Sequence, residues 1–121
     1  QVGLLAREHP GTRFVLGHSG ILHYWREAMQ VGLMRENVYL TLCGGHPEAL
    51  REIVDAIPAD RLLWGSDYLG PGSEELFAYR MGLMDLLGLS PERRRAILQG
   101  NPARLFGIRI EGKDDGCELR V

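Results

Sequence analysis

The chain has 121 residues, of which 45% are hydrophobic and 25% are charged, and its formal net charge is -2. This composition is typical of one small soluble domain and, with no basic run beyond Arg93-Arg94-Arg95, gives no electrostatic signal for nucleic acid or an anionic membrane. The sequence contains neither an apolar stretch long enough to span a bilayer nor a signal segment, so we expect a cytoplasmic protein with a small-molecule substrate.

The chain begins with Gln1 and what looks like the end of an amphipathic helix, so we expect it to be a fragment of a longer protein. Strands and helices then alternate. The expected elements are a strand at 13–17, a helix at 21–35, a strand at 38–42, a helix at 47–57 and a strand at 62–64. This βαβαβ order indicates an α/β fold, and strands that are apolar on both faces are typical of a parallel sheet covered by helices.

Each expected helix carries an apolar stripe at helical spacing, which predicts packing against the sheet. The stripes are Leu22, Trp25, Met29 and Leu33, then Leu50, Ile53, Val54 and Ile57, then Leu76, Tyr79, Leu83, Leu86 and Leu87 in a helix at 74–87. Ser73 is placed to cap that third helix and Gly88 to end it. Ser90-Pro91 and Asn101-Pro102 have the pattern of two further helix starts.

The last residues, 108–121, alternate apolar and charged side chains around a turn, which predicts a short hairpin or a frayed tail. We therefore expect one domain at 1–107 followed by this tail. Cys117 in the tail and Cys43 in an apolar run form no disulfide framework and no C-x-x-C metal motif, so both are expected to be free thiols.

Two of the expected strands end in polar side chains. His18 follows the run Phe14 to Gly17, and Asp67 follows Leu62 to Trp64 after Gly65 and Ser66. The carboxyl ends of parallel strands are where α/β folds place their chemistry. The sequence therefore predicts a site that contains His18 and Asp67.

Five segments in this order resemble the C-terminal half of the amidohydrolase-related metal-dependent hydrolases. These segments are 8–20, 37–41, 59–68, 89–92 and 100–107. The resemblance implies a TIM-like (β/α)₈ barrel, of which this chain supplies about strands six to eight and their helices. It also implies a divalent metal, zinc or alternatively manganese, at the mouth of that barrel.

In the family the metal is held by a His-x-His pair on the first strand, a His on the fifth and an Asp on the eighth, beside a His on the sixth. The resemblance makes Asp67 the metal ligand and catalytic base, and His18 the catalytic imidazole beside the metal. The remaining ligands lie outside this chain, so the isolated chain is expected to be inactive. The open edges of its sheet are expected to favour self-association.

Other interpretations of these residues stay open. His18 is alternatively a structural histidine satisfied by backbone groups, and Asp67 a turn carboxylate. Three weaker candidates are His46 after the second strand, Tyr68 beside Asp67, and Trp64. Asn101 is expected to be a helix N-cap that ties the final helix to the sheet, with Arg104 as a structural contact nearby.

Three functions fit these features. The first is hydrolysis of C–N or C–O bonds by metal-activated water, with a nonoxidative decarboxylase of the same superfamily as a close alternative. The second is a noncatalytic remnant of such an enzyme. The third is a doubly wound nucleotide-binding domain, which we rank last because no G-x-G-x-x-G turn follows the first strand.

Overall fold

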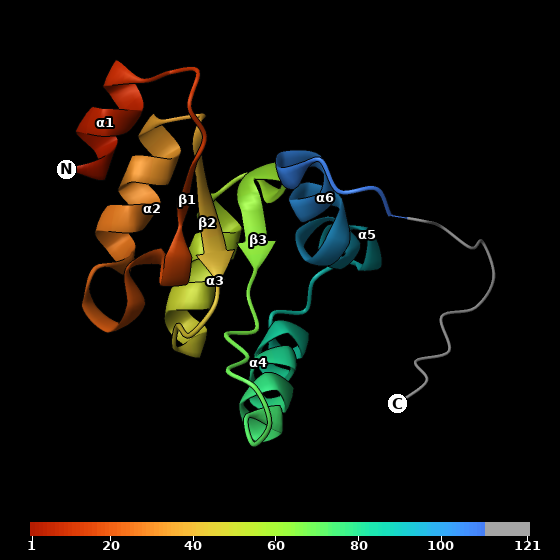
Figure 1. Ribbon diagram of the computed structural model, residues 1–121. Coiled ribbons are helices and arrows are strands. Elements are labelled where there is room, and N and C mark those ends of the chain that lie inside the picture. The colour runs from red at the N-terminus through yellow and green to blue at the C-terminus, as the bar shows by residue number, and fades with distance from the viewer. Residues whose placement is uncertain (111–121) are drawn as a thin grey trace.

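The structure, a computed structural model, describes residues 1–110 apart from the side chains of residues 21 and 22. Its elements are α1 (Val2–Glu8), β1 (Phe14–Leu16), η1 (Gly17–His23), α2 (Trp25–Met34), β2 (Val38–Leu42), α3 (Pro47–Ala56), η2 (Ala59–Arg61), β3 (Leu62–Trp64), α4 (Glu74–Leu86), α5 (Pro91–Arg95), η3 (Ala96–Gly100) and α6 (Asn101–Phe106). The predicted βαβαβ order is confirmed (Figure 1).

The three strands form one parallel sheet in the order β1-β2-β3. Leu16 pairs with Leu40, and Leu42 pairs with Trp64, so the carboxyl ends of all three strands point the same way. Within the described part of the chain the sheet is open, with β1 and β3 at its edges. Residues that follow the strands therefore lie together along the carboxyl ends of the three strands, which we call the carboxyl edge of the sheet, as expected for a site.

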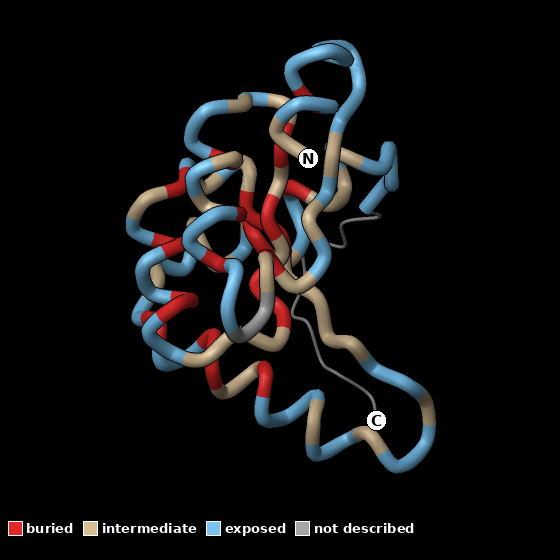
Figure 2. The backbone as a smooth tube through the Cα atoms, turned by 90° about the vertical axis from the view of Figure 1, so that its left-hand side faces the viewer, coloured by how far each residue is buried: buried red, intermediate tan, exposed pale blue. Residues whose placement is uncertain are grey.

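Alternation along β2 separates a buried face from a partly buried one. Val38, Leu40 and Leu42 are buried, whereas Tyr39 and Thr41 between them are only partly buried. The prediction that the strands are buried on both faces is therefore wrong for β2, because successive side chains of a strand point to opposite faces and only one of these meets the helices. Figure 2 shows the buried segments gathered in the interior of the molecule, with exposed segments around them.

Helix α3 confirms its predicted stripe, since Leu50, Ile53, Val54 and Ile57 are all buried in the core. Helix α2 departs from its prediction in where it starts. The predicted helix at 21–35 begins only at Trp25, after the 3₁₀ turn η1. The residues just before the predicted start, His18, Ser19 and Gly20, have φ angles of 58°, 44° and 79°, which lie outside the right-handed helical region.

The stripe of α2 also differs from the prediction. Leu33 is 51% exposed, while Ala28 and Gly32 are buried against the sheet beside Trp25. A Cβ atom at Gly32 would lie 2.6 Å from the Leu40 side chain, so a larger residue would require the buried Leu40 side chain to shift. The predicted stripe also included Leu22, whose side chain the structure does not describe. Apolar spacing identified the helix, but small residues decide which of its faces packs.

Helix α4 has its predicted range but not its predicted stripe. Tyr79 and Leu86 are exposed, while Arg80 is buried beside Leu83, Met84 and Leu87. Ser73 occupies the N-cap position without capping, because its hydroxyl oxygen accepts a hydrogen bond from the Leu69 amide and its proton is donated to the Gly70 carbonyl. Gly88 ends the helix with a φ of 57°, as predicted.

The two predicted final helices form one continuous run, in which the π-helical turn η3 joins α5 to α6. Ser90 caps its start, as predicted, by accepting a hydrogen bond from the Arg93 amide. Asn101 is not an N-cap, because the preceding Gly100 is already helical. Its buried side chain instead donates to the Leu62 and Ala59 carbonyls at 2.8 and 2.6 Å, which ties the run to β3.

Asn101→Ala is expected to lower the free energy of unfolding by about 1–3 kcal/mol, because it leaves buried carbonyl oxygens without a donor. Chemical denaturation followed by circular dichroism measures the change. Gln99→Ala on the exposed side of the same run is the control, expected to stay within about 0.5 kcal/mol of the unsubstituted chain. Equal stability of the two variants would contradict this role of Asn101.

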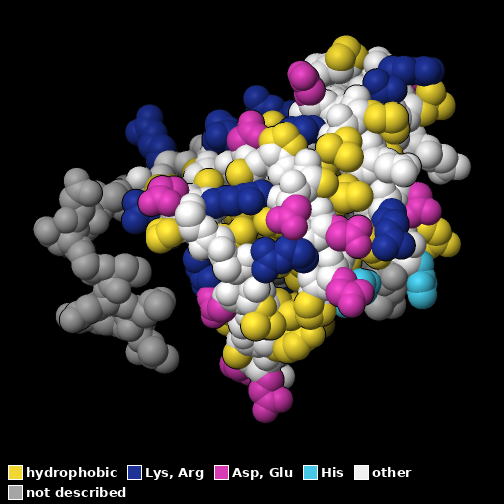
Figure 3. All heavy atoms as spheres, turned by 180° about the vertical axis from the view of Figure 1, so that it is seen from behind, with side chains coloured by type: hydrophobic (Ala, Val, Ile, Leu, Met, Phe, Trp, Pro, Cys, Tyr) yellow, Lys and Arg dark blue, Asp and Glu magenta, His cyan; other side chains and the backbone are white. Residues whose placement is uncertain are grey.

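None of the helices in the described residues is long and apolar enough to cross a membrane. On the face shown in Figure 3, acidic and basic side chains are interspersed over the helices. Of the predicted tail, residues 108–110 form no strand, and residues 111–121, with Cys117, lie outside the described residues. The predicted boundary at 107 therefore stays a prediction, although Gly107 does end α6 in a left-handed conformation.

Candidate active site at the carboxyl edge of the sheet

His18 is the first predicted site residue, and it lies at the start of η1, just after β1. Its backbone is left-handed, with a φ of 58°. The imidazole makes no hydrogen bond to any described group, and its Nδ1 atom is buried without a partner. The alternative of a structural histidine satisfied by backbone groups is therefore not supported by its contacts.

Asp67 is the second predicted site residue, and it follows β3 after Gly65 and Ser66. Its φ of 52° is also left-handed. Non-glycine residues adopt this conformation rarely, and such strain is concentrated at functional sites. The Asp67 side chain is 34% exposed, so the carboxylate is open to solvent on one side.

The fold brings these two side chains together although β2 separates their strands. His18 Nε2 lies 3.8 Å from Asp67 Oδ1. Cys43, which follows β2, completes a group of three in which one donor atom from each residue lies within 4.8 Å of the others. The three strands thus each contribute one polar or sulfur-bearing side chain to the same edge.

Arg80 is a site residue that the sequence analysis missed. It reaches from α4 to the site and donates hydrogen bonds to Asp67 Oδ2 at 2.7 Å, the Ser66 carbonyl at 2.8 Å and Cys43 Sγ at 3.0 Å. Its side chain is only 9% exposed. An arginine on a predicted helix is normally assigned to the solvent face, and no signal in the sequence indicated another orientation.

Arg80 sets the electrostatics of the site. Its hydrogen bond, opposed by partial desolvation, lowers the pKa of the Asp67 carboxyl below its ordinary value, so Asp67 is ionised at neutral pH. Burial raises the pKa of the Cys43 thiol, and the nearby guanidinium only partly offsets this effect. Cys43 is therefore a neutral thiol in a site that contains one carboxylate and one guanidinium.

A divalent cation fits part of this donor set. Asp67 Oδ2 is occupied by Arg80, whereas Oδ1 faces His18 and accepts no hydrogen bond from a described group. An ionised carboxylate oxygen and a neutral imidazole are both suitable ligands for zinc or manganese. Cys43 fits less well, because its sulfur accepts a hydrogen bond from the Arg80 guanidinium. Two donors fall short of the three protein ligands that catalytic zinc requires.

Tyr68 and Ser66 line a cavity of about 450 Å³ beside the site, together with Glu74 and Phe77. The cavity walls are mainly aromatic. Tyr68 donates its hydroxyl proton to Glu74 at 3.3 Å. Trp64 packs edge-on against Phe77 with ring centroids 5.7 Å apart, which is a packing role.

His46 has a structural role. It is the N-cap of α3, where its Nδ1 atom accepts a hydrogen bond from the Ala49 amide, and its ring contacts Trp25 edge-on at 6.1 Å. A histidine directly before a helix-starting proline was the sequence signal for this role. Arg104 donates to the Asp60 carbonyl at 2.8 Å, as expected for a structural contact.

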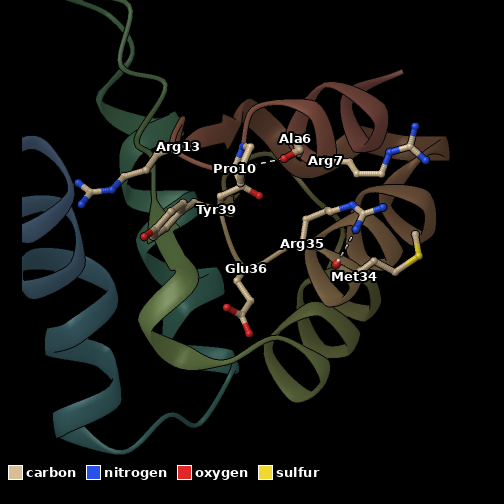
Figure 4. A pocket seen from close by; sticks show the side chains of 10 residues that line it. Ala6, Arg7, Pro10, Arg13, Met34, Arg35, Glu36 and Tyr39 are labelled. Atoms are coloured by element: carbon tan, nitrogen blue, oxygen red, sulfur yellow. Dashed lines mark hydrogen bonds between the residues drawn. The ribbon is translucent and has the colours of Figure 1, made fainter.

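A second cavity, of about 470 Å³, lies at the opposite end of the sheet, near the amino ends of β1 and β2 (Figure 4). The side chains of Arg7, Arg13 and Arg35 surround it with Glu36 and Tyr39. It contains no imidazole, thiol or paired carboxylates. The chemistry-bearing groups are therefore at the carboxyl edge, and not in this larger cavity.

Comparison with known proteins identifies the family. A family model described as amidohydrolase matches residues 2–108. The chain belongs to the amidohydrolase family. Among curated proteins, this amidohydrolase-family chain is similar to the 2-keto-4-carboxy-3-hexenedioate hydratase of Sphingobium sp. strain SYK-6, with 25% identity over 122 residues. That match covers 86% of this chain and 36% of the hydratase.

The fold of this amidohydrolase-family chain is also found in a solved structure. A candidate 2-pyrone-4,6-dicarboxylic acid hydrolase from Pseudomonas putida matches with a TM-score of 0.64 and 24% identity, over 91% of this chain and 49% of that one. The likeness establishes the fold, an α/β unit with an open three-stranded parallel sheet that corresponds to part of the larger structure. The chain spans about a third to a half of the length of these two proteins.

Proposed function

We propose that this chain provides one side of the active site of a metal-dependent hydrolase, in which a divalent metal activates water to attack a small-molecule substrate at a C–N or C–O bond. The observation that carries the proposal is the convergence of His18 and Asp67, 3.8 Å apart and both in left-handed backbone conformations. Family membership supports an enzyme as the complete protein.

In this proposal Asp67 and His18 have separate tasks. Asp67 keeps one oxygen on Arg80 and presents the other, Oδ1, where it orients a water molecule and accepts its proton. A zinc or manganese ion with Asp67 among its ligands would lower the pKa of that water. His18 presents Nε2 on the same side, where it hydrogen-bonds a substrate oxygen and stabilises negative charge that develops on it.

Hydration of a small carboxylic acid is the second candidate function. It is favoured by the similarity to the Sphingobium hydratase. Both candidates require an activated water molecule, so they use the same residues in the same roles. The decarboxylase and the noncatalytic remnant stay predictions that the similarities do not address.

The proposal extends to features of the whole protein. We place the three strands as about the sixth to eighth of a (β/α)₈ barrel, with the remaining metal ligands on its other strands. A small-molecule substrate, a cytoplasmic location and the absence of nucleic-acid and membrane partners belong to the same proposal. Self-association through the edges β1 and β3 is proposed for the isolated chain, because exposed sheet edges pair readily with other chains.

Metal titration and turnover of Asp67→Asn test the proposal. Calorimetry on the 121-residue chain is expected to give no tight stoichiometric zinc binding and no difference between the unsubstituted chain and the variant, because two donors do not complete a site. In the protein with its complete ligand set, Asp67→Asn is expected to remove most metal-dependent turnover.

The matched control is Asp55→Asn, which changes an exposed carboxylate on α3 and is expected to leave turnover unchanged. Asparagine is the substitution of choice at 67, since its side-chain oxygen still accepts a hydrogen bond from Arg80. Unchanged turnover in Asp67→Asn would overturn the proposed function. Tight zinc binding by the short chain would show that the ligand set is wrongly placed.

A further inference from the structure

Thr41 lies on β2 between the strands that precede the two proposed catalytic residues. Its hydroxyl oxygen accepts a hydrogen bond from the His18 amide at 2.8 Å and donates one to the Leu16 carbonyl at 3.1 Å. Its backbone carbonyl accepts a third hydrogen bond from the Ser19 hydroxyl at 2.8 Å. One residue of the middle strand thus contacts three residues around the carboxyl end of β1.

These bonds hold a backbone that is unfavourable by itself. His18 and Ser19 are consecutive non-glycine residues with φ angles of 58° and 44°. Such conformations cost of order 1–3 kcal/mol each and persist only where the surroundings determine them. Ser19 is 2% exposed, so its hydroxyl has no solvent to replace the Thr41 carbonyl. The contacts with Thr41 are the hydrogen bonds that fix this pair of residues to the sheet.

The imidazole of His18 depends on this backbone for its position. No hydrogen bond from a described group fixes the ring itself, and Nδ1 is buried without a partner. The position of Nε2 beside Asp67 therefore follows from the direction in which the His18 backbone projects its side chain, and from packing. A change in the backbone of residue 18 moves Nε2, because no hydrogen bond from a described group holds the ring in place.

We propose that Thr41 is a positioning residue: its hydroxyl fixes the left-handed backbone of His18 and thereby directs Nε2 toward Asp67. The effect of Thr41 on catalysis rests on the proposed function, in which His18 is a catalytic residue. Thr41 touches neither the reacting groups nor the Asp67 carboxylate in any hydrogen bond of the described residues, so it acts through His18 alone. Its position at the partly buried face of β2, predicted only as part of an apolar strand, gives it access to the end of β1.

Thr41→Val and Thr41→Ser test the proposal in the 121-residue chain. Valine has nearly the shape of threonine but lacks the hydroxyl, and serine keeps the hydroxyl. In Thr41→Val the His18 amide and imidazole signals in nuclear magnetic resonance spectra are expected to shift and broaden, whereas Thr41→Ser is expected to restore them. Thr12→Val, at an exposed threonine, is the matched control and is expected to leave the His18 signals unchanged.

A purely structural Thr41 would give a different result, namely a lower melting temperature with unchanged His18 imidazole signals in the folded variant. That outcome would overturn the proposal. If Thr41→Val does not fold, amide hydrogen exchange in the unsubstituted chain decides: the His18 amide is expected to exchange slowly because Thr41 accepts its proton, and fast exchange would contradict the assignment.

The proposal and the proposed function fail separately. In the protein with its complete ligand set, Thr41→Val is expected to lower kcat by roughly ten- to a hundredfold, the usual effect of a misplaced catalytic group, with serine restoring most of it. Shifted His18 signals together with unchanged kcat in His18→Asn would uphold Thr41 as the positioning residue and overturn the catalytic role of His18. Unshifted His18 signals in Thr41→Val, together with a large loss of kcat in His18→Asn, would overturn the positioning role of Thr41 and uphold the catalytic role of His18.

Discussion

Asp67→Ala is expected to lower the stability of the fold, because it leaves the buried Arg80 guanidinium without its carboxylate partner. The Arg80 side chain is 9% exposed, so water cannot replace the lost partner fully. Alanine also tolerates the left-handed backbone at residue 67, with its φ of 52°, less well than aspartate or asparagine. Denaturant unfolding monitored by circular dichroism measures the loss.

A double-mutant cycle separates the effect of the unpaired Arg80 charge from the effect of alanine on the backbone of residue 67. Asp67→Ala combined with Arg80→Met removes both partners and is expected to be more stable than Asp67→Ala alone, since no buried charge remains. Asp67→Asn is expected to be milder, because the amide oxygen still accepts from Arg80. Glu75→Ala, at an exposed position of α4, is the control, with an expected change within about 0.5 kcal/mol. Additive losses in the double variant would disprove the coupling between Asp67 and Arg80.

His18→Asn is expected to lower kcat by roughly a hundredfold or more in the protein with its complete ligand set, the usual scale for losing a general acid–base group or an oxyanion donor. The fold and the metal content are expected to stay unchanged. The reason is structural: no described group hydrogen-bonds the imidazole, so its removal leaves no buried partner unsatisfied. Steady-state kinetics, metal analysis and the melting temperature of this one variant give the three quantities.

Each alternative role of His18 has its own signature. A fall in metal content parallel to activity would make His18 a metal ligand, and a lower melting temperature with normal kcat would make it structural. His23→Asn, at an exposed histidine of η1, is the control and is expected to alter none of the three quantities. An unchanged kcat in His18→Asn would end the catalytic assignment.

Several features of the molecule could be predicted from the sequence because they depend on local patterns. The βαβαβ order follows from short apolar runs that alternate with amphipathic stretches, and α3 packs with its predicted stripe of Leu50, Ile53, Val54 and Ile57. His18 and Asp67 were identified because each follows an apolar run. Since parallel strands end at one edge, this placement alone predicts that the two side chains lie near each other.

Contacts between distant segments were not predicted. Arg80 follows Asp67 by 13 residues, and nothing in its neighbours indicates that its guanidinium turns inward to a carboxylate, a carbonyl and a thiol. Asn101 had the spacing of a helix cap, yet it holds β3 because the π-helical turn keeps the chain helical through Gly100. The packing face of α2 was also not predicted, because Gly32 is buried against the core whereas Leu33 is exposed.

The sequence by itself determined the family, through its resemblance to known members. It also determined the order of the elements and the two residues at the strand ends, because these are properties of local composition and spacing. Only the tertiary structure decided how those two residues are held. The left-handed backbones of His18 and Asp67 are unfavourable in isolation. Thr41 on the neighbouring strand accepts a hydrogen bond from the His18 amide, and Arg80 on a following helix donates hydrogen bonds to the Asp67 carboxylate and to the Ser66 carbonyl before it. Such bonds between segments leave no periodic trace in the chain.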